Sequence, residues 1–261
     1  ESVCCIAREA GYFLKEERKN FRRERVMEKH AHDYVSYVDK ESEVRLVKAL
    51  SALLPEAGFI TEEGSATYQD EPYCWVIDPL DGTKEFIKRN GEFTVNIAYV
   101  KNGKPEAGVI YIPVKEELYF ADSQYGAYKI EHITQLDSEE TVDSLISKAH
   151  RLPYQEEAQR SSFIIVASRS HLTPETEAYI EEMKQKHQEV ETVSKGSSLK
   201  LCLIAEGKAD VYPRFAPTME WDTAAGHAII RAMGKEVYQA GTQHPLEYNK
   251  EDLLNPWFIA E

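Results

Sequence analysis

The sequence predicts a protein of the α/β to α+β class with two lobes. Apolar residues recur at helical spacing near the N-terminus, and short apolar runs bounded by turn residues follow them. In the second half of the chain, strand-like runs alternate with helix-like segments. We expect an N-terminal α+β lobe in residues 1–135 and a C-terminal α/β lobe in residues 136–261.

Two helices are predicted to open the chain. Residues 2–28 form the first, because apolar side chains recur every three or four positions. The second begins after Asp39 on the same ground, and Pro55 ends it. The positions that carry the two patterns are Val3, Ile6, Ala10, Val44, Val47 and Leu50.

Short apolar runs then predict strands. The runs at 58–61 and 73–77 each end directly on acidic residues. A strong turn signal, Asn102-Gly103, separates two later runs, so we expect an antiparallel meander. The strands of this meander are predicted at 93–100, 107–114, 118–121 and 126–130.

The second half begins with a polar, poorly periodic connection at 131–161, with a short helix expected at 142–148. Pro174 follows Thr173, which is typical of a capped helix start. Strands are predicted at 163–167, 190–193, 209–213 and 236–239, and helices at 175–187, 197–206 and 222–233.

Composition limits the possible functions. The 261 residues include 31 basic and 45 acidic ones, so the net charge is −14, and such a chain repels a nucleic-acid polymer over most of its surface. The longest apolar runs, such as residues 163–167, are far too short to span a bilayer. We expect a cytoplasmic protein, with peripheral association at the inner membrane left open.

The four cysteines support the same location. Cys4, Cys5, Cys74 and Cys202 contain no C-x-x-C pair, and two of them are adjacent, so the pattern suits neither a zinc site nor a disulfide framework. We expect them to be small buried apolar side chains.

Acidic residues gather where predicted elements begin or end. Glu62-Glu63 follows one strand, Asp78 and Asp81 follow the next, and Asp222 opens a helix. Each has an ordinary structural reading, since a lone acid often caps a helix and an Asp-Pro-x-Asp-Gly segment can be a plain turn. Together they form a hard-oxygen environment, which suits Mg²⁺ or Mn²⁺ rather than zinc or copper.

Convergence of Glu62, Asp78, Asp81 and Asp222 would place four negative charges in one pocket. Each close pair would cost several kcal/mol, so the cluster would need cations or protons. Bound divalent ions would also supply the local positive charge that a phosphate needs on so acidic a protein.

Two segments carry a family resemblance. Residues 78–83 (Asp-Pro-Leu-Asp-Gly-Thr), preceded by Trp75-Val76-Ile77, and residues 221–226 (Trp-Asp-Thr-Ala-Ala-Gly) resemble the paired signatures of the inositol monophosphatase superfamily. The resemblance implies a layered αβαβα sandwich of the sugar phosphatase and inositol monophosphatase type. It also implies a lithium-sensitive, Mg²⁺-dependent phosphomonoesterase.

Within the superfamily, the chain looks most like the bacterial 3'(2'),5'-bisphosphate nucleotidases of the CysQ type. Inositol monophosphatases generally have Thr-Asn where this chain has Lys84-Glu85. Residues 36–39 (Ser-Tyr-Val-Asp) depart from the usual family pattern, although Asp39 itself matches. The stretches that carry this closer resemblance are 81–87, 167–171, 196–203, 209–215 and 221–227.

The resemblance implies a role for each acid. Thr83 would orient the attacking water, with Asp39 behind it as the base. The alternative, purely structural interpretation of Thr83 is a helix N-cap. Glu62 rather than Glu63 would face the metal, because adjacent side chains diverge. A first metal would be held by Glu62, Asp78 and the Leu80 carbonyl, and a second by Asp78, Asp81 and Asp222.

Substrate contacts follow from the same resemblance. Lys200 and Arg214 would clamp a phosphate that is not cleaved, although each alone would read as an ordinary surface residue. The substrate-binding residues implied are Gly82, Thr83, His171, Ser197, Lys200, Arg214 and Asp222.

The predicted reaction converts adenosine 3',5'-bisphosphate to AMP and phosphate, using water and two or three Mg²⁺ ions. Mn²⁺ is a possible substitute, and Li⁺ and Ca²⁺ are expected to inhibit. The only partner expected is this small nucleotide, on a monomer or homodimer without a transmembrane segment. The alternatives are an inositol 1-phosphate or sugar phosphate phosphatase and, more remotely, an inactive metal- or phosphate-binding module.

Overall fold

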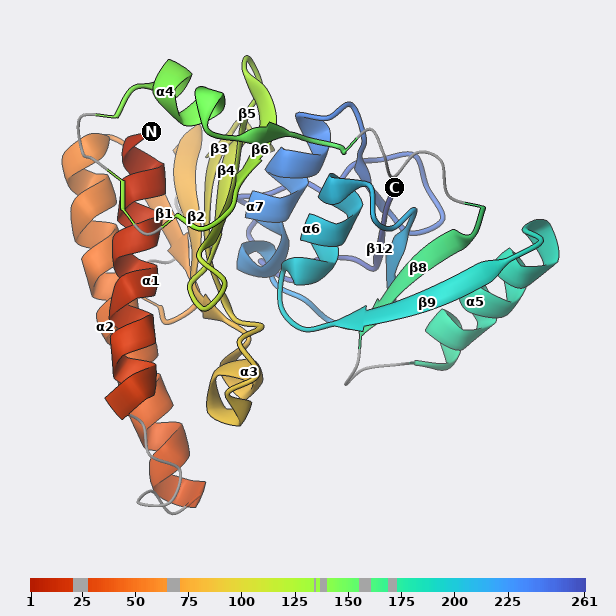
Figure 1. Cartoon of the computed structure of the whole chain (residues 1–261), viewed down its shortest axis with the longest axis horizontal. Coiled ribbons are helices and arrows are strands. Elements are labelled where there is room, and N and C mark those ends of the chain that lie inside the picture. The colour runs from red at the N-terminus through yellow and green to blue at the C-terminus, as the bar shows by residue number, and fades with distance from the viewer. Residues whose placement is uncertain (21–27, 65–70, 134, 137–139, 155–160, 169–172) are drawn as a thin grey trace.

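The computed structural model describes residues 1–20, 28–64, 71–133, 135–136, 140–154, 161–168 and 173–261. The elements stack in alternating layers of helices and sheets (Figure 1). Helices α1 (Ser2–Asn20) and α2 (Glu28–Leu53) cover one face of a large sheet, and α6 (Leu199–Glu206) and α7 (Glu220–Arg231) cover its other face. Small sheets and α5 (Pro174–Lys186) follow beyond them. This arrangement confirms the expected layered sandwich.

The large sheet has seven strands in the order β1-β2-β3-β4-β5-β6-β7. β1 and β2 are parallel, and every later pair is antiparallel, which confirms the meander. The two-residue β7 was not predicted, because it contains no apolar run. The strands are β1 Gly58–Thr61, β2 Tyr73–Asp81, β3 Thr94–Lys101, β4 Lys104–Ile112, β5 Glu117–Asp122, β6 Gly126–Ile130 and β7 His150–Arg151.

The first two helices differ from the prediction at their ends. α1 spans Ser2–Asn20 rather than 2–28, and residues 21–27 lie outside the described part of the chain. α2 spans Glu28–Leu53, so Asp39 lies inside this helix. The sequence prediction, which began the helix after Asp39, was wrong on this point. The reason is that residues 28–38 contain no glycine or proline that would delay the helix.

Strand β2 shows why the sheet has two cores. Cys74 and Val76 face α6 and α7, whereas Trp75 and Ile77 face α1 and α2. Successive side chains of a strand point to opposite faces, so a strand covered on both sides is apolar at every position. This explains the uninterrupted apolar run that ends at the acids.

Helix α7 (Glu220–Arg231) lies unusually close to the sheet. A Cβ atom on Gly108 of β4 would lie 2.4 Å from the Ala225 carbonyl oxygen and 2.9 Å from the Ala228 Cβ. The glycine and the small residues of α7 therefore permit a contact that larger side chains would block. This contact fixes the start of α7, which carries Asp222, against the large sheet.

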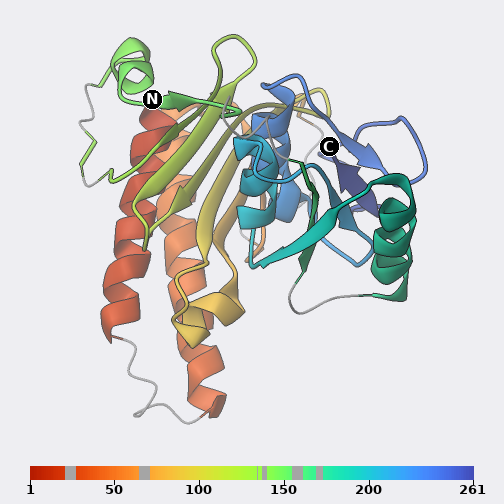
Figure 2. The ribbon, with the colours of Figure 1, turned by 45° about the vertical axis from the view of Figure 1, so that its right-hand side comes forward.

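The remaining elements form the far layers, which lie opposite α1 and α2 (Figure 2). β8 and β9 form a parallel pair, and three short strands are ordered β10-β12-β11. Thr173 caps α5 as predicted, since its Oγ1 accepts the Thr176 amide at 3.3 Å. These elements are β8 Phe163–Ser168, α5 Pro174–Lys186, β9 Val190–Lys195, β10 Tyr212–Arg214, β11 Val237–Gln239 and β12 Phe258–Ala260. The short α3 (Thr83–Lys88) follows β2, and α4 (Val142–Ser147) lies where a short helix was expected in the connection after β6.

Three smaller expectations can be compared with these elements. β10 begins at Tyr212 rather than at 209, and β12 was not predicted. The cysteines are free, and all are buried except the half-buried Cys5. Within the described part of the chain, no helix combines the length and apolar character that a membrane span requires.

Candidate active site

A bulge at the end of β2 brings two acids onto one face of the sheet. Asp78 pairs with Asn96 of β3, and Asp81 pairs with Thr94, so three steps on β2 oppose two on β3. In a regular strand, residues three apart point to opposite faces. The extra residue reverses this, and Pro79, which has no N–H to donate, lies inside the irregular stretch.

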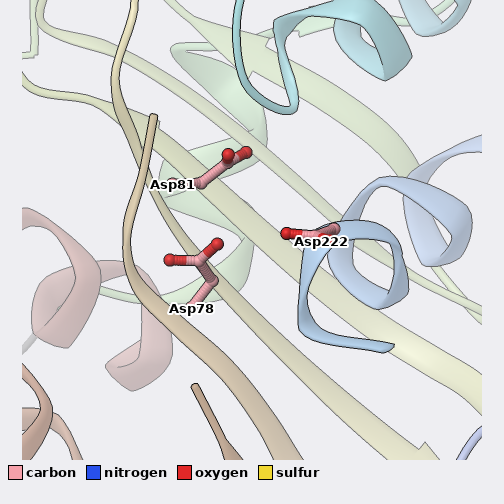
Figure 3. A group of neighbouring side chains, drawn as sticks. All are labelled: Asp78, Asp81 and Asp222. Carbon is pink, nitrogen blue, oxygen red and sulfur yellow. The ribbon is translucent and has the colours of Figure 1, made fainter. Parts of the chain in front are cut away.

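Asp222 completes a group of three carboxylates with Asp78 and Asp81 (Figure 3). Each offers one oxygen that lies within 4.8 Å of the other two. Asp78 is buried and the others are half-buried. The sequence placed Asp78 and Asp81 after one strand and Asp222 at the start of a distant helix, and the fold brings the three together.

Each of the three carboxylates also accepts a backbone N–H. Asp78 Oδ1 accepts the Leu80 amide at 3.0 Å, and Asp222 Oδ2 accepts the Met219 amide at 2.7 Å. Asp81 Oδ2 accepts the Ser198 amide. Such bonds orient a carboxylate and leave its second oxygen for a ligand. The bond to Met219 is the capping interaction that the sequence allowed for Asp222, although Met219 is the N-cap.

Burial and mutual repulsion raise the pKa of these acids. Burial and then the charges of Glu62, Asp81 and Asp222 raise the pKa of Asp78 well above its ordinary value. Burial and the charge of Asp81 raise the pKa of Asp222 to about 6. Buried like charges are costly without a counter-ion, and oxygen-only donors suit hard cations. The donor set therefore fits Mg²⁺ or Mn²⁺.

Glu62 and Asp39 lie beside this group. Glu62 shares a side-chain hydrogen bond with Asp78, while loss of water and the nearby acids raise its pKa to about 7. Asp39 is buried, and its Oδ1 has no hydrogen-bond partner among the described residues. Burial and the charge of Glu62 raise the pKa of Asp39 to about 9. The neighbouring Glu63 is fixed through its backbone, since its amide donates to Glu43 Oε2 at 2.8 Å.

The turn after Asp81 begins α3. Gly82 is the N-cap with a φ of 94°, a left-handed conformation that favours glycine, and Thr83 is the first helical residue. Thr83 is therefore not the helix cap that its purely structural interpretation predicted. Leu80, whose carbonyl was assigned to a metal, lies fully buried within the bulge.

A pocket opens beside the carboxylates. It is lined by Asp81 together with five predicted substrate residues, Gly82, Ser197, Lys200, Arg214 and Asp222. His171 lies outside the described residues.

Two of the basic residues that line this pocket, Lys200 and Arg214, are placed differently. Lys200 is 9% exposed and donates to the Ser197 carbonyl at 2.6 Å; burial lowers its pKa, which Asp81 partly offsets. Arg214 donates to the Pro217 carbonyl at 3.2 Å, and its Nε has no partner within the described part of the chain.

Several pocket residues were not assigned from the sequence. Lys195, Tyr212 and Phe258 also line the pocket. Asn96 and Ser198 contact Asp81 directly. A signal for Asn96 was present, since it is polar in an otherwise apolar run; Phe258 follows no motif.

Comparison with known proteins decides the family. The profile described as "Inositol monophosphatase family" matches residues 2–259. The chain belongs to this family. The 3'(2'),5'-bisphosphate nucleotidase CysQ of Escherichia coli strain K12 is 39% identical over 262 residues, which cover 99% of this chain and 97% of the relative. The fructose-1,6-bisphosphatase/inositol-1-monophosphatase of Aquifex aeolicus strain VF5 is 28% identical and covers 86% of this chain and 79% of its own length.

A solved structure agrees with these relatives. The crystal structure of CysQ from Bacteroides thetaiotaomicron, described as a bacterial member of the inositol monophosphatase family, has a TM-score of 0.88. It is 52% identical and covers 100% of this chain and 95% of its own. The resemblance drawn from the two signatures is confirmed, and the chain is a phosphatase of this family.

Proposed function

We propose that the protein hydrolyses the 3'-phosphate of adenosine 3',5'-bisphosphate to give AMP and phosphate in a Mg²⁺-dependent reaction. The observation that carries this proposal is the shared pocket of Asp81, Asp222, Lys200 and Arg214. A substrate with two phosphates needs two anion sites, and this pocket offers acids that suit cations beside two basic side chains. The CysQ relatives carry the name of this activity.

The carboxylates would hold the metal ions. Glu62, Asp78 and the Leu80 carbonyl are proposed for one ion, and Asp78, Asp81 and Asp222 for another. Bound Mg²⁺ would neutralise these acids, polarise the phosphate and make water a better nucleophile. Two or three ions are proposed, with Mn²⁺ as a substitute and Li⁺ and Ca²⁺ as inhibitors.

The remaining roles belong to the chain itself. Thr83 would orient the attacking water, and Asp39, which is buried and has an unpartnered Oδ1 among the described residues, would accept the proton from it as a carboxylate once the metal ions neutralise the neighbouring acids. The amides of Gly82 and Thr83 would bind phosphate oxygens, and Ser197 and His171 would contact the nucleotide. The water attacks phosphorus directly, so no covalent enzyme intermediate is required.

Arg214 and Lys200 would bind the 5'-phosphate. A planar guanidinium forms paired hydrogen bonds with phosphate oxygens, and an ammonium adds a point charge. Arg214 keeps an unpartnered Nε among the described residues, which supports its availability for a ligand.

A panel of phosphomonoesters tests the proposal. With Mg²⁺ present, kcat/KM should be highest for adenosine 3',5'-bisphosphate or its 5'-phosphosulfate relative, lower for adenosine 3'-monophosphate, and lowest for inositol 1-phosphate and fructose 1,6-bisphosphate. Preference for inositol 1-phosphate would replace the nucleotidase with the inositol or sugar phosphate alternative. Absence of turnover on every ester, in protein that still binds Mg²⁺, would favour the inactive binding module.

Two further proposals accompany this one. Residues 1–135 would supply the first metal ligands, and residues 136–261 would complete the metal site and bind the nucleotide. A cytoplasmic location and a monomeric or homodimeric state are also proposed, to be tested by fractionation and by light scattering.

A further inference from the structure

A buried polar network holds Asp81 from behind. It consists of Thr94 and Asn96 on β3 and Ser198, the residue that precedes α6. All three are buried, with exposed fractions of 0%, 1% and 4%. They lie between the large sheet and the start of α6, so the network joins the two predicted lobes directly at the carboxylate group shown in Figure 3.

The hydrogen bonds of the network orient the Asn96 amide. Asn96 Oδ1 lies 3.0 Å from Thr94 Oγ1 and 2.9 Å from Ser198 Oγ, and the two hydroxyls lie 2.7 Å apart. An amide oxygen can only accept, so Oδ1 accepts from at least one of these hydroxyls. Asn96 Nδ2 then donates to Asp81 Oδ2 at 3.2 Å. Rotating the amide by half a turn would set its carbonyl oxygen against the carboxylate and break both sets of contacts. The hydroxyls therefore fix which end of Asn96 faces Asp81.

The network bonds that reach Asp81 all end on the same oxygen. Oδ2 accepts from Asn96 and from the Ser198 amide, and Thr94 Oγ1 lies 3.5 Å from it. None of the described residues of the network donates to Oδ1, so Oδ1 is the oxygen that remains available to bind a metal ion. A ligand carboxylate held through one oxygen loses little freedom when the other binds a metal.

We infer that Thr94, Asn96 and Ser198 are positioning residues, which set the affinity of the Asp81 metal site by orienting its carboxylate. The inference rests on the metal dependence proposed above. The inference also links the metal site to the predicted substrate residues. Ser198 directly follows Ser197, and the Ser197 carbonyl accepts a hydrogen bond from the Lys200 ammonium. None of the three positioning residues needs to contact substrate for this role.

Paired variants at Thr94 test the inference. Thr94→Val removes the hydroxyl with little change of shape, whereas Thr94→Ser keeps the hydroxyl and removes a methyl group. Isothermal titration with Mg²⁺ should show affinity about threefold to tenfold weaker for Thr94→Val and near wild type for Thr94→Ser. Equal affinities in both variants would overturn the inference.

Asn96→Ala removes the central residue. Its Mg²⁺ affinity should fall by about 10- to 100-fold, with much of kcat recovered at saturating Mg²⁺. Loss of kcat at saturating Mg²⁺ with unchanged Mg²⁺ affinity would also contradict the inference. If Asn96→Ala fails to fold, the Thr94 pair decides alone.

A matched control separates positioning from simple stability. Thr176 is a buried threonine on α5 whose hydroxyl lies 3.1 Å from that of Thr173, far from the acids in sequence. Thr176→Val should lower the melting temperature without changing the Mg²⁺ titration. If Thr176→Val shifts the titration as Thr94→Val does, general destabilisation explains both. Wild-type protein that neither binds Mg²⁺ nor hydrolyses the nucleotide would instead refute the proposed function.

Discussion

The two ends of helix α6 hold buried charges in contrasting ways. At its start, Ser198 donates to Asp81, which belongs to a group of acids. At its end, Glu206 Oε1 accepts hydrogen bonds from the Tyr119 hydroxyl and from Lys129 Nζ, each at 2.7 Å. Among the described residues, none of the three carboxylates at the start forms an ion pair, although Lys200 lines the same pocket, whereas Glu206 at the end pairs with Lys129 and Lys208 in a cluster of mixed charge.

The mixed cluster is satisfied by the protein itself. Lys129 is 3% exposed and lies 2.7 Å from Glu206, 2.9 Å from Glu131 and 3.4 Å from Glu117. Burial would raise the pKa of Glu206, but the bonds from Lys129, Tyr119 and Lys208 outweigh it and lower that pKa.

The acids near Asp81 show the opposite direction, since the pKa of each is raised. Buried acids that the protein itself pairs with basic side chains are structural, whereas buried acids that lack such ion pairs indicate a ligand that brings positive charge. At the two ends of α6, the ion pairing and the direction of the pKa shift therefore agree.

The largest expected effect comes from Asp81→Asn. The substitution keeps the shape of the side chain but removes a ligand charge, so kcat/KM should fall by about 10³-fold, because metal charge stabilisation is worth several kcal/mol. Steady-state kinetics at several Mg²⁺ concentrations measures this loss, and circular dichroism checks the fold. Glu206→Gln is the matched control at the other end of α6 and should retain activity. Near wild-type turnover in Asp81→Asn would remove Asp81 from the metal site.

Arg214→Ala extends the comparison to the basic side chains. Lys129 is surrounded by protein carboxylates, whereas Arg214 keeps an unpartnered Nε in the described part of the structure. The loss of a charge-assisted hydrogen bond of about 1.5–3 kcal/mol lowers kcat/KM for adenosine 3',5'-bisphosphate by roughly 10- to 150-fold. Turnover of adenosine 3'-monophosphate should change by about threefold or less, since it has no 5'-phosphate. Equal losses on both substrates would mean that Arg214 supports the fold instead.

The acids were predictable because their motif is local. Asp78, Asp81 and Asp222 lie in two short signatures, and the apolar run before Asp78 already indicated a buried strand. The bulge that turns Asp78 and Asp81 onto one face was not predicted. It depends on how β2 pairs with β3, and pairing register is a property of two strands rather than of one.

Other features escaped prediction for similar reasons. β12 is three residues long and exists because β10 and β11 flank it, so its own sequence carries little signal. Asp39 was placed before a helix because the apolar spacing begins only at Val44, but the upstream segment contains no helix breaker and α2 extends past Asp39. The network behind Asp81 needs β3 and α6 to meet, and these elements lie about a hundred residues apart.

Glu206→Gln should have a smaller effect, and on stability rather than catalysis. The variant keeps the size of the side chain and removes the charge that Lys129 and Lys208 contact. Lys129 retains Glu117 and Glu131, so we expect the free energy of unfolding to fall by about 1–3 kcal/mol. Urea denaturation measures this loss. A fall in kcat without any loss of stability would show that the mixed cluster also serves the reaction.

The smallest expected effect is a difference in pH dependence between the two ends of α6. The pKa of Asp222 is raised from 3.8 to about 6, and that of Glu62 from 4.5 to about 7. Protons therefore bind more tightly to the folded protein than to the unfolded chain, so the metal-free protein loses stability as the pH rises from about 4 to about 7. Glu206 has a lowered pKa and acts in the opposite direction, since its contribution is lost as the pH falls.

Melting temperatures measured with EDTA and with Mg²⁺ test this difference. The Mg²⁺-induced rise should grow from about pH 5 to about pH 8, reaching a few degrees, because deprotonated acids bind the ion more tightly. Asp81→Asn should flatten the dependence by removing one of the repelling charges, whereas Glu206→Gln should leave the Mg²⁺-induced rise unchanged. A rise that is independent of pH in the wild-type protein would mean that the acids near Asp81 are not the groups that Mg²⁺ neutralises, and the contrast between the two ends of α6 would no longer identify a binding site.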